Sequence, residues 1–173
     1  MHRLFFAVVP DADARTAVAR VVDTLRHAHG EGGWVAAEKW HETIVFLGGW
    51  EAFPADVAAR AAAAAASMRE SAPTVVLDRL GDFDGGRRPW YLGCSGPGGV
   101  DALAAAVRAR LAGAGLAFDT RPFVPHLTVR RARGRAPAGP IAPIAWTAGD
   151  FVLFHSAPDA PAYRVLARFA TIA

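Results

Sequence analysis

Short apolar runs that end at glycine or proline are the main pattern of this chain. Arg3–Val9 and Trp40–Leu47 are rich in aromatic and β-branched residues, and they end at Pro10 and Gly48. This pattern predicts β-strands. The same pattern predicts further strands over residues 74–80, 89–94, 126–129, 150–155 and 163–170. The last two should pair as a terminal hairpin.

Apolar residues at helical spacing predict three helices. Asp11 is suited to cap a helix in which Val18, Val22 and Leu25 lie on one face, and Gly30 should end it. Two more helices are predicted over residues 54–69, where a proline suits the first turn and an alanine run follows, and over residues 100–111.

Two segments predict loops. Residues 81–88 hold three glycines between two predicted strands, and residues 133–143 combine proline, glycine, alanine and arginine. We expect the second segment to be exposed and mobile.

The bulk composition predicts a soluble, folded protein. Of the 173 residues, 53% are hydrophobic and 20% are charged, which is enough for a core and excludes a mainly disordered chain. The apolar runs are too short to cross a membrane, and Leu4–Val9 is followed at once by Pro10 and Asp11, unlike a secretion signal. We therefore expect a cytoplasmic protein without a membrane partner.

Cysteine and charge content narrow the possible chemistry only slightly. One cysteine permits no internal disulfide and no thiolate-rich metal site. The net charge is +3, and Lys39 is the only lysine, so nearly all positive charge is arginine. Arginine suits an anionic substrate, but a GC-rich genome explains the same bias equally well.

A four-residue pattern of histidine, any residue, threonine and an aliphatic residue occurs twice. The copies are His41–Ile44 and His126–Val129, about half the chain apart. On a strand, residues i and i+2 share a face, so each copy presents an imidazole beside a hydroxyl. The repeat, together with the similar order of elements in each half, predicts a duplicated architecture with two pseudo-equivalent lobes.

Two imidazoles can act as acid and base on a phosphodiester near neutral pH. His41 and His126 are therefore the candidate catalytic residues, and the hydroxyls of Thr43 and Thr128 can donate to phosphate oxygens. The pattern requires no metal, and two histidines without clustered carboxylates or cysteines are a poor metal site. We expect no metal and no cofactor.

Arg130 and Arg131 directly follow the second motif. Strand alternation would place Arg130 on the face of His126 and Thr128, and Arg131 on that face only if the strand twists or ends there. One of the two arginines should contact the phosphate.

The chain resembles the 2H phosphoesterase superfamily, in particular its RNA 2′,3′-cyclic phosphodiesterase branch, also called 2′-5′ RNA ligase. The likeness spans nearly the whole chain. It lies in the two motifs, in the opening Arg3–Val8, in the stretches His41–Gly48 and Arg121–Arg131, and in the terminal segment Phe151–Phe169.

The resemblance implies an α+β fold, a bilobal duplicated 2H phosphoesterase fold in which two antiparallel sheets line a central groove and helices pack outside. The chain, residues 1–173, would be one domain of two pseudo-symmetric lobes. The implied activity is metal-independent hydrolysis of an RNA terminal 2′,3′-cyclic phosphate to a 2′-phosphate, with reversible 2′-5′ ligation in some members.

The resemblance also implies residue roles. His41 would donate a proton to the leaving 3′ oxygen, and His126 would activate water. Thr43 and Thr128 would bind phosphate. Arg131 matches the arginine that closes the family's second motif, so on that ground we prefer it to Arg130.

Two positions depart from the family pattern. Glu42 stands where an aliphatic residue is usual, and its side chain should point away from the groove into the packing layer. Arg130 stands where a small residue is usual.

Aromatic rings could stack on the nucleobase. Phe123 is the first candidate for base binding, with Tyr163 and Trp34 after it, although Trp34 and Trp90 are better explained as core residues.

Two alternatives stay open: phosphodiesterase activity on small cyclic nucleotides, and a non-catalytic RNA-end binder. The expected partners are RNA ends or nucleotides that carry a 2′,3′-cyclic phosphate, bound by a monomer.

Overall fold

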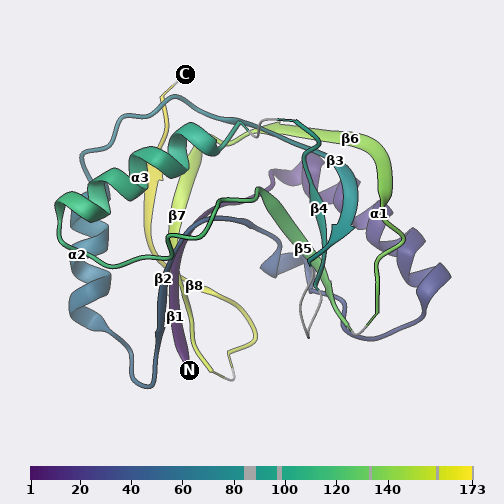
Figure 1. Ribbon diagram of the computed structural model, residues 1–173, viewed down its shortest axis with the longest axis horizontal. Coiled ribbons are helices and arrows are strands. Elements are labelled where there is room, and N and C mark those ends of the chain that lie inside the picture. Colours follow the sequence, from purple (N-terminus) through teal and green to yellow (C-terminus); the bar gives the residue numbers. More distant parts are fainter. Residues whose placement is uncertain (84–88, 97–98, 133, 159, 173) are drawn as a thin grey trace.

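The strands form one antiparallel sheet in this computed structural model, which describes residues 1–83, 89–96, 99–132, 134–158 and 160–172 (Figure 1). Their order across the sheet is β6-β3-β4-β5-β2-β1-β7-β8. The strands are β1 (His2–Val8), β2 (Glu42–Trp50), β3 (Thr74–Asp82), β4 (Pro89–Gly93), β5 (His126–Arg131), β6 (Gly139–Thr147), β7 (Asp150–Ser156) and β8 (Arg164–Ala170). Every strand predicted from the apolar runs is present.

The sheet consists of two four-stranded halves that meet at one residue pair. β6, β3, β4 and β5 form one half, and β2, β1, β7 and β8 form the other. Between β5 and β2 the register contains a single pair, Glu42 opposite Leu127. The predicted α+β fold is confirmed, and the two expected sheets are the two halves joined at this junction pair.

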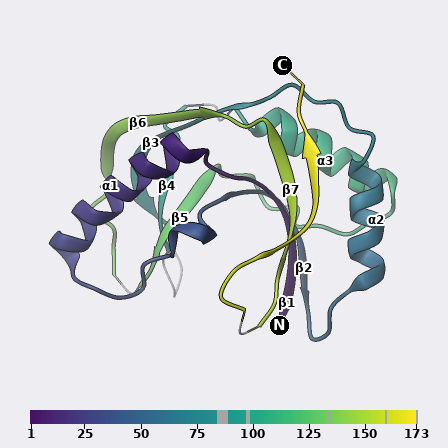
Figure 2. The ribbon, with the colours of Figure 1, turned by 180° about the vertical axis from the view of Figure 1, so that it is seen from behind.

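The helices cover different halves of the sheet. α1 (Ala12–His29) contacts β6, whereas α2 (Ala55–Ala65) contacts β8 and α3 (Asp101–Gly113) contacts both α2 and β2. Figure 2 shows α1 beside one half and α2 and α3 beside the other. Because α1 follows β1 yet packs on the far half, and α3 follows β4 yet packs on β2, the chain crosses repeatedly between the halves.

Each helix buries one apolar face, as the spacing predicts. α1 begins at Asp11, whose carboxylate accepts a hydrogen bond from the backbone N–H of Ala14 at 2.8 Å. The buried positions are Ala14, Val18 and Val22 in α1, Ala58, Ala61 and Ala65 in α2, and Leu103, Ala104, Val107 and Leu111 in α3. Each larger side chain contributes about 1.5–3 kcal/mol through this burial.

The expected extent of α2 was wrong. The helix ends at Ala65 instead of residue 69, and the next two turns are tight, with Ala66 and Met68 donating to the carbonyls of Ala63 and Ala65. This change of direction brings the Met68 side chain into the core, where it is 2% exposed.

The prediction of a loop over residues 133–143 was wrong for residues 139–143, which belong to a strand. β6 begins at Gly139 and pairs with β3 despite Pro140 and Pro143. β6 is an edge strand, so its outward backbone positions need no N–H donor and tolerate proline. Residue 133 and residues 84–88 of the other predicted loop lie outside the described residues.

None of the helices within the described ranges has the length and apolar character that crossing a membrane requires.

Candidate active site

The junction pair brings the two histidine motifs together. Because Glu42 lies opposite Leu127 in antiparallel register, His41 falls beside Thr128, and Thr43 falls beside His126. Neighbouring side chains on a strand alternate in direction, so both histidines and both threonines lie on one face. Glu42 and Leu127, which are 1% and 0% exposed, lie on the buried face.

The orientation of His41 is fixed from its outer side. Its Nδ1–H donates to the carbonyl oxygen of Lys39 at 2.7 Å, and η1 (Ala37–Lys39) sets the place of that carbonyl. A carbonyl oxygen only accepts, so Nδ1 carries the hydrogen and Nε2 is the nitrogen that can exchange a proton. Nε2 lies 3.0 Å from the hydroxyl oxygen of Thr43.

His126 is held in the same way. Its Nδ1–H donates to the carbonyl oxygen of Val124 at 2.7 Å, again two residues earlier in the chain. Both motifs therefore fix the same tautomer and leave Nε2 as the reactive nitrogen. This common arrangement could not be seen in the motif itself, because it depends on the backbone before each strand.

Each histidine is lined by its own aromatic rings. The ring of His41 lies 4.9 Å from that of Phe5, 5.2 Å from Tyr163 and 6.2 Å from Phe154, measured between centroids. Burial lowers the pKa of His41 to about 4; the Lys39 carbonyl opposes this effect, and the positive charges of His126 and Arg131 lower the pKa further. Free His41 is therefore neutral at pH 7.

The ring of His126 lies 4.8 Å from Phe83 and 5.7 Å from Tyr91. Burial lowers the pKa of His126 as well, the Val124 carbonyl opposes this, and Arg131 adds to the lowering. The influence of Arg131 on both histidines indicates that its guanidinium faces the site.

A bulge in β5 explains why Arg131 faces the site. Thr128 pairs with Tyr91 on β4, but Arg130 pairs with Trp90 and Arg131 with Pro89, so one extra residue is inserted in β5 between them. The extra residue resets the alternation of side chains. Arg131 therefore shares the face of Thr128, as the family resemblance implied and simple alternation did not.

Arg130, the other candidate for binding phosphate, has contacts on the side of Trp34 and Trp90. Its guanidinium lies between Trp34 and Trp90, 4.6 and 4.7 Å from the ring centroids. It also donates to the carbonyl oxygens of Gly32 and His29 at 3.1 and 3.2 Å. Arg130 thus fastens the segment after α1 to β5, and Trp34 is engaged with it.

The two base-binding candidates have different surroundings. Tyr163 meets His41 edge to face at the site. Phe123 packs against the core, with the guanidinium of Arg108 at 5.8 Å from its ring.

Sequence reasoning missed the rings that line the histidines: Phe5, Phe83, Tyr91 and Phe154. The sequence carried no signal for Tyr91, because the two glycines beside it, Gly81 opposite it on β3 and Gly93 two residues along β4, become its neighbours only in the folded sheet. A Cβ atom on Gly81 or on Gly93 would approach the Tyr91 ring to 2.9 Å. The glycines therefore let the Tyr91 ring lie close to the sheet, where Phe83 stacks on it at 4.5 Å.

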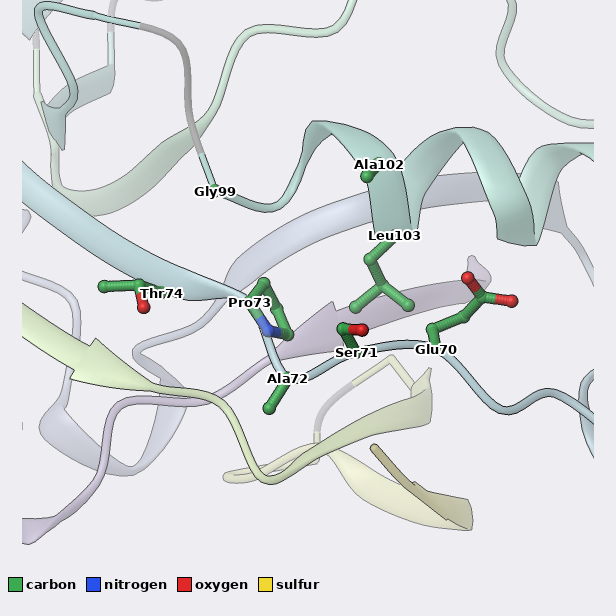
Figure 3. A pocket seen from close by; sticks show the side chains of 8 residues that line it. All are labelled: Glu70, Ser71, Ala72, Pro73, Thr74, Gly99, Ala102 and Leu103. Atoms are coloured by element: carbon green, nitrogen blue, oxygen red, sulfur yellow. The ribbon is translucent and has the colours of Figure 1, made fainter. Parts of the chain in front are cut away.

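A separate pocket lies at the start of α3 (Figure 3). Its lining residues are Glu70, Ser71, Ala72, Pro73, Thr74, Gly99, Ala102 and Leu103. It contains neither motif histidine. Across the described part of the chain, no cluster of three or more His, Cys, Asp or Glu side chains could hold a metal ion.

Comparison with known proteins decides the family. The model of the 2′-5′ RNA ligase superfamily matches residues 10–161. The chain belongs to this superfamily. The chain is also similar to an RNA 2′,3′-cyclic phosphodiesterase of Escherichia coli (strain K12), with 31% identity over 158 residues that cover 90% of this chain and 87% of that protein.

A second relative is longer than this chain. The RNA 2′,3′-cyclic phosphodiesterase of Geobacillus stearothermophilus is 28% identical over 177 aligned residues, which cover 95% of this chain. The alignment covers only 56% of that relative's length.

Solved structures of E. coli LigT have the same fold as this chain over nearly its full length. LigT complexed with 3′-AMP superposes with a TM-score of 0.78 at 28% identity, covering 99% of both chains. LigT complexed with phosphate gives a TM-score of 0.73 at 27% identity, covering 99% of this chain and 98% of LigT.

Proposed function

We propose that this protein is a metal-independent RNA 2′,3′-cyclic phosphodiesterase that hydrolyses a terminal cyclic phosphate to a 2′-phosphomonoester. The observation that carries the proposal is the register of Glu42 with Leu127, which sets two histidines and two threonines on one face. The naming of two relatives for this activity, and the LigT structures with 3′-AMP and with phosphate, support it.

The reaction needs one proton removed and one supplied. A water oxygen attacks phosphorus and loses its proton to Nε2 of His126. The bond from phosphorus to the 3′ oxygen breaks, and that oxygen takes the proton from Nε2 of His41. The tautomers support this scheme, since each Nδ1–H is held by a carbonyl oxygen and each Nε2 is left to exchange the proton.

Substrate binding favours the protonated form of His41, which is the form that can act as an acid. The pKa of free His41 is near 4, so the ring rarely carries a proton at neutral pH. A phosphate anion beside Nε2 favours the protonated imidazolium and raises this pKa. The donor is thus protonated mainly when substrate is bound.

Three further groups would hold the phosphate. The hydroxyls of Thr43 and Thr128 lie on the histidine face, and the guanidinium of Arg131 offers a planar pair of donors. These groups stabilise the charge that develops on the non-bridging oxygens as water attacks. Arg130 has no part in this set, because Trp34, Trp90 and two carbonyl oxygens already engage it.

The base of the terminal nucleotide would stack on the rings beside the histidines. Tyr163 on one side and the stacked pair of Phe83 and Tyr91 on the other are the best placed. Phe123 is the weaker choice, since it packs against the core and under Arg108.

Turnover of a cyclic-phosphate substrate with chelator present tests the proposal. The substrate is a DNA oligonucleotide that ends in one ribonucleotide 2′,3′-cyclic phosphate, so no other position can be cleaved by the same chemistry. We expect a 2′-phosphate product from the wild type, and losses of about 10²–10⁴-fold in kcat for His41→Ala and for His126→Ala. Full activity of either variant would exclude the two-histidine mechanism.

The same assay separates the alternatives. Equal efficiency on a free cyclic nucleotide would favour a small-molecule phosphodiesterase, and tight binding without turnover would favour an RNA-end binder. Incubation of the cyclic-phosphate substrate with an excess of 5′-hydroxyl RNA tests for reversible 2′-5′ ligation, because the 5′ hydroxyl then replaces water as the nucleophile and the 3′ oxygen is again the leaving group. We also propose that residues 1–173 act as one monomeric, cytoplasmic domain of two pseudo-symmetric lobes; size-exclusion chromatography should give the mass of a monomer, 18.2 kDa.

A further inference from the structure

Glu42 places a carboxyl group inside the core directly behind the histidine motif. It lies between His41 and Thr43 in sequence, its side chain takes the opposite face of the strand, and it is 1% exposed. Its neighbours across the sheet are Val8 on β1 and Leu127 on β5, both fully buried and apolar. α3 packs against β2, so this carboxyl is closed in from the helix side as well.

No opposite charge compensates this carboxyl among the described residues. Its Oε1 is buried and has no hydrogen-bond partner there. The charged group that acts on it is the carboxylate of Asp101 at the start of α3, which carries the same sign. The arginine of α3 that lies nearest the middle of the helix, Arg108, is directed to the carbonyl oxygen of Arg121. Burial and Asp101 raise the pKa of Glu42 to about 8.

The junction that holds Glu42 is the weakest pairing in the sheet. β1 and β2 pair over the whole length of β1, and β4 and β5 pair from Pro89 to Gly93, whereas β2 and β5 share one pair. A charge at this one position therefore acts on the single pair that joins β2 to β5 among the described residues. The segment before the first motif is also held to β5, by hydrogen bonds from Val35 N–H to the Val129 carbonyl oxygen at 2.9 Å and from Arg131 N–H to the Gly33 carbonyl oxygen at 2.6 Å, so the opening is confined to the junction pair.

We propose that Glu42 is a positioning residue: its neutral carboxyl keeps the two halves of the sheet joined, and its ionisation in alkaline solution separates His41 from His126 and stops the reaction. The inference rests on the proposed function. A carboxylate in this apolar layer has to draw in water, which parts the strands at the junction pair. A displacement of about 1 Å at reacting groups lowers a rate by about 10²-fold, so a local opening is sufficient.

The pH dependence of kcat/KM tests this, with the same oligonucleotide substrate between pH 6 and pH 9.5. Above neutral pH the histidines alone make log kcat/KM fall by one unit per pH unit. In the wild type the slope should double above about pH 8, because a second group must then be protonated. Glu42→Gln, which is neutral at every pH, should keep the single slope.

Two more variants sharpen the comparison. Glu51→Gln changes an exposed carboxylate just beyond β2 and should follow the wild type. Glu42→Leu places an aliphatic side chain at the same position and should follow Glu42→Gln. The ratio of Glu42→Gln to wild-type activity should be constant below pH 7 and rise by about tenfold per pH unit above pH 8.

Two measurements that do not need turnover accompany the assay. The far-ultraviolet circular dichroism of the wild type should be the same at pH 9.5 as at pH 7, because the opening is local. The ring Cε1–H resonance of His41 should shift in a second step above about pH 8 in the wild type, and this step should be absent from Glu42→Gln.

Each adverse result has a definite meaning. Equal slopes for wild type and Glu42→Gln overturn the inference, and so does global unfolding of the wild type at pH 9.5. If no variant turns over substrate at any pH, the proposed function fails instead, and the His41 resonance alone decides: a missing second step in the wild type overturns the role of Glu42.

Discussion

A hydrogen bond to a carbonyl oxygen decides which nitrogen of each motif histidine can take part in chemistry. Lys39 holds Nδ1 of His41, and Val124 holds Nδ1 of His126, both at 2.7 Å. Both rings therefore have the same tautomer, with Nε2 free to exchange a proton. Their surroundings differ, because the rings of Phe5, Tyr163 and Phe154 enclose His41. This difference sets how readily each ring binds a proton.

The pH optimum follows from the two histidine pKa values. Both are lowered from 6.5 in the free enzyme, His41 to about 4. Because kcat/KM reports the free enzyme, which needs one protonated and one neutral ring, we expect its bell-shaped profile to centre below pH 6.5. A bound phosphate anion raises both pKa values, so the profile of kcat should centre at higher pH.

Steady-state kinetics from pH 4 to pH 8 measure both profiles. Coincident optima for kcat and kcat/KM would contradict the role of the phosphate anion in loading the acid, and a kcat/KM optimum well above pH 6.5 would contradict the burial of the free histidines.

The two adjacent arginines should respond oppositely to replacement by alanine. Arg131→Ala removes a phosphate donor, so kcat/KM should fall by about 10²–10³-fold with little change in the free energy of unfolding. Arg130→Ala removes the contacts with Trp34 and Trp90, so the free energy of unfolding should fall by about 1–3 kcal/mol. Its kcat/KM per folded molecule should stay within a few-fold of the wild type. Urea denaturation and kinetics on the two variants check this, and a reversed pattern would move the phosphate contact to Arg130.

The two arginines also show which parts of the site can be predicted from the sequence and which cannot. The spacing within the two motifs was sufficient to select both histidines and both threonines as candidates, since alternation on a strand is a local rule. Alternation failed at Arg130 because the inserted residue in β5 depends on the partner strand β4, which the motif does not contain.

At the scale of elements, two glycines shape the wall beside His126. Gly81 on β3 and Gly93 on β4 leave room for the ring of Tyr91, which pairs across the sheet with Thr128. The strands were predictable from their apolar runs, but this use of glycine was not, because it depends on which strands become neighbours. The same holds for β6, whose prolines indicated a loop until its place at the sheet edge was known.

Replacing Gly93 on β4 by alanine should therefore disturb the wall of the site beside His126. Its Cβ would lie 2.9 Å from the Tyr91 ring and 3.2 Å from the carbonyl oxygen of Pro125, next to His126. We expect a loss of about 1–3 kcal/mol in unfolding free energy and a fall in kcat/KM, since the ring and the motif both have to shift.

Gly139→Ala is the matched control, because a Cβ at that position of β6 meets no atom within 4 Å. Thermal denaturation and kinetics on both variants provide the comparison. Equal stability and activity for Gly93→Ala and Gly139→Ala would show that the Tyr91 ring does not need its close approach to the sheet.

For the molecule as a whole, the chain passes repeatedly between two halves of the sheet, whose adjoining strands β2 and β5 pair at Glu42 and Leu127. α1 follows a strand of one half and packs on β6 of the other, and α3 follows β4 and packs on β2. The order of elements predicted two units, but their interlocking is a long-range feature with no local signature. The site therefore forms only when both halves are complete, and conditions that weaken the junction should reduce stability and activity together.

Buried groups act on the pH dependence of global stability in opposite directions: His41 and His126, whose pKa values are lowered, and Glu42, whose pKa is raised. Between pH 4 and 6.5 His41 is neutral when folded and protonated when unfolded, so it adds stability as pH rises. The pKa of Glu42 is raised from 4.5 to about 8, so its contribution is complete below pH 4.5 and is lost as pH rises toward 8. The two slopes, each about 1.4 kcal/mol per pH unit, oppose one another below pH 6.5. Above pH 6.5 only the loss from Glu42 remains, so the wild type should lose stability between pH 6.5 and 8, whereas Glu42→Gln should not. Urea denaturation at half-unit intervals measures this, and parallel curves for the two proteins would mean that Glu42 is ionised in the folded state at neutral pH and that the core beneath the histidines is wet.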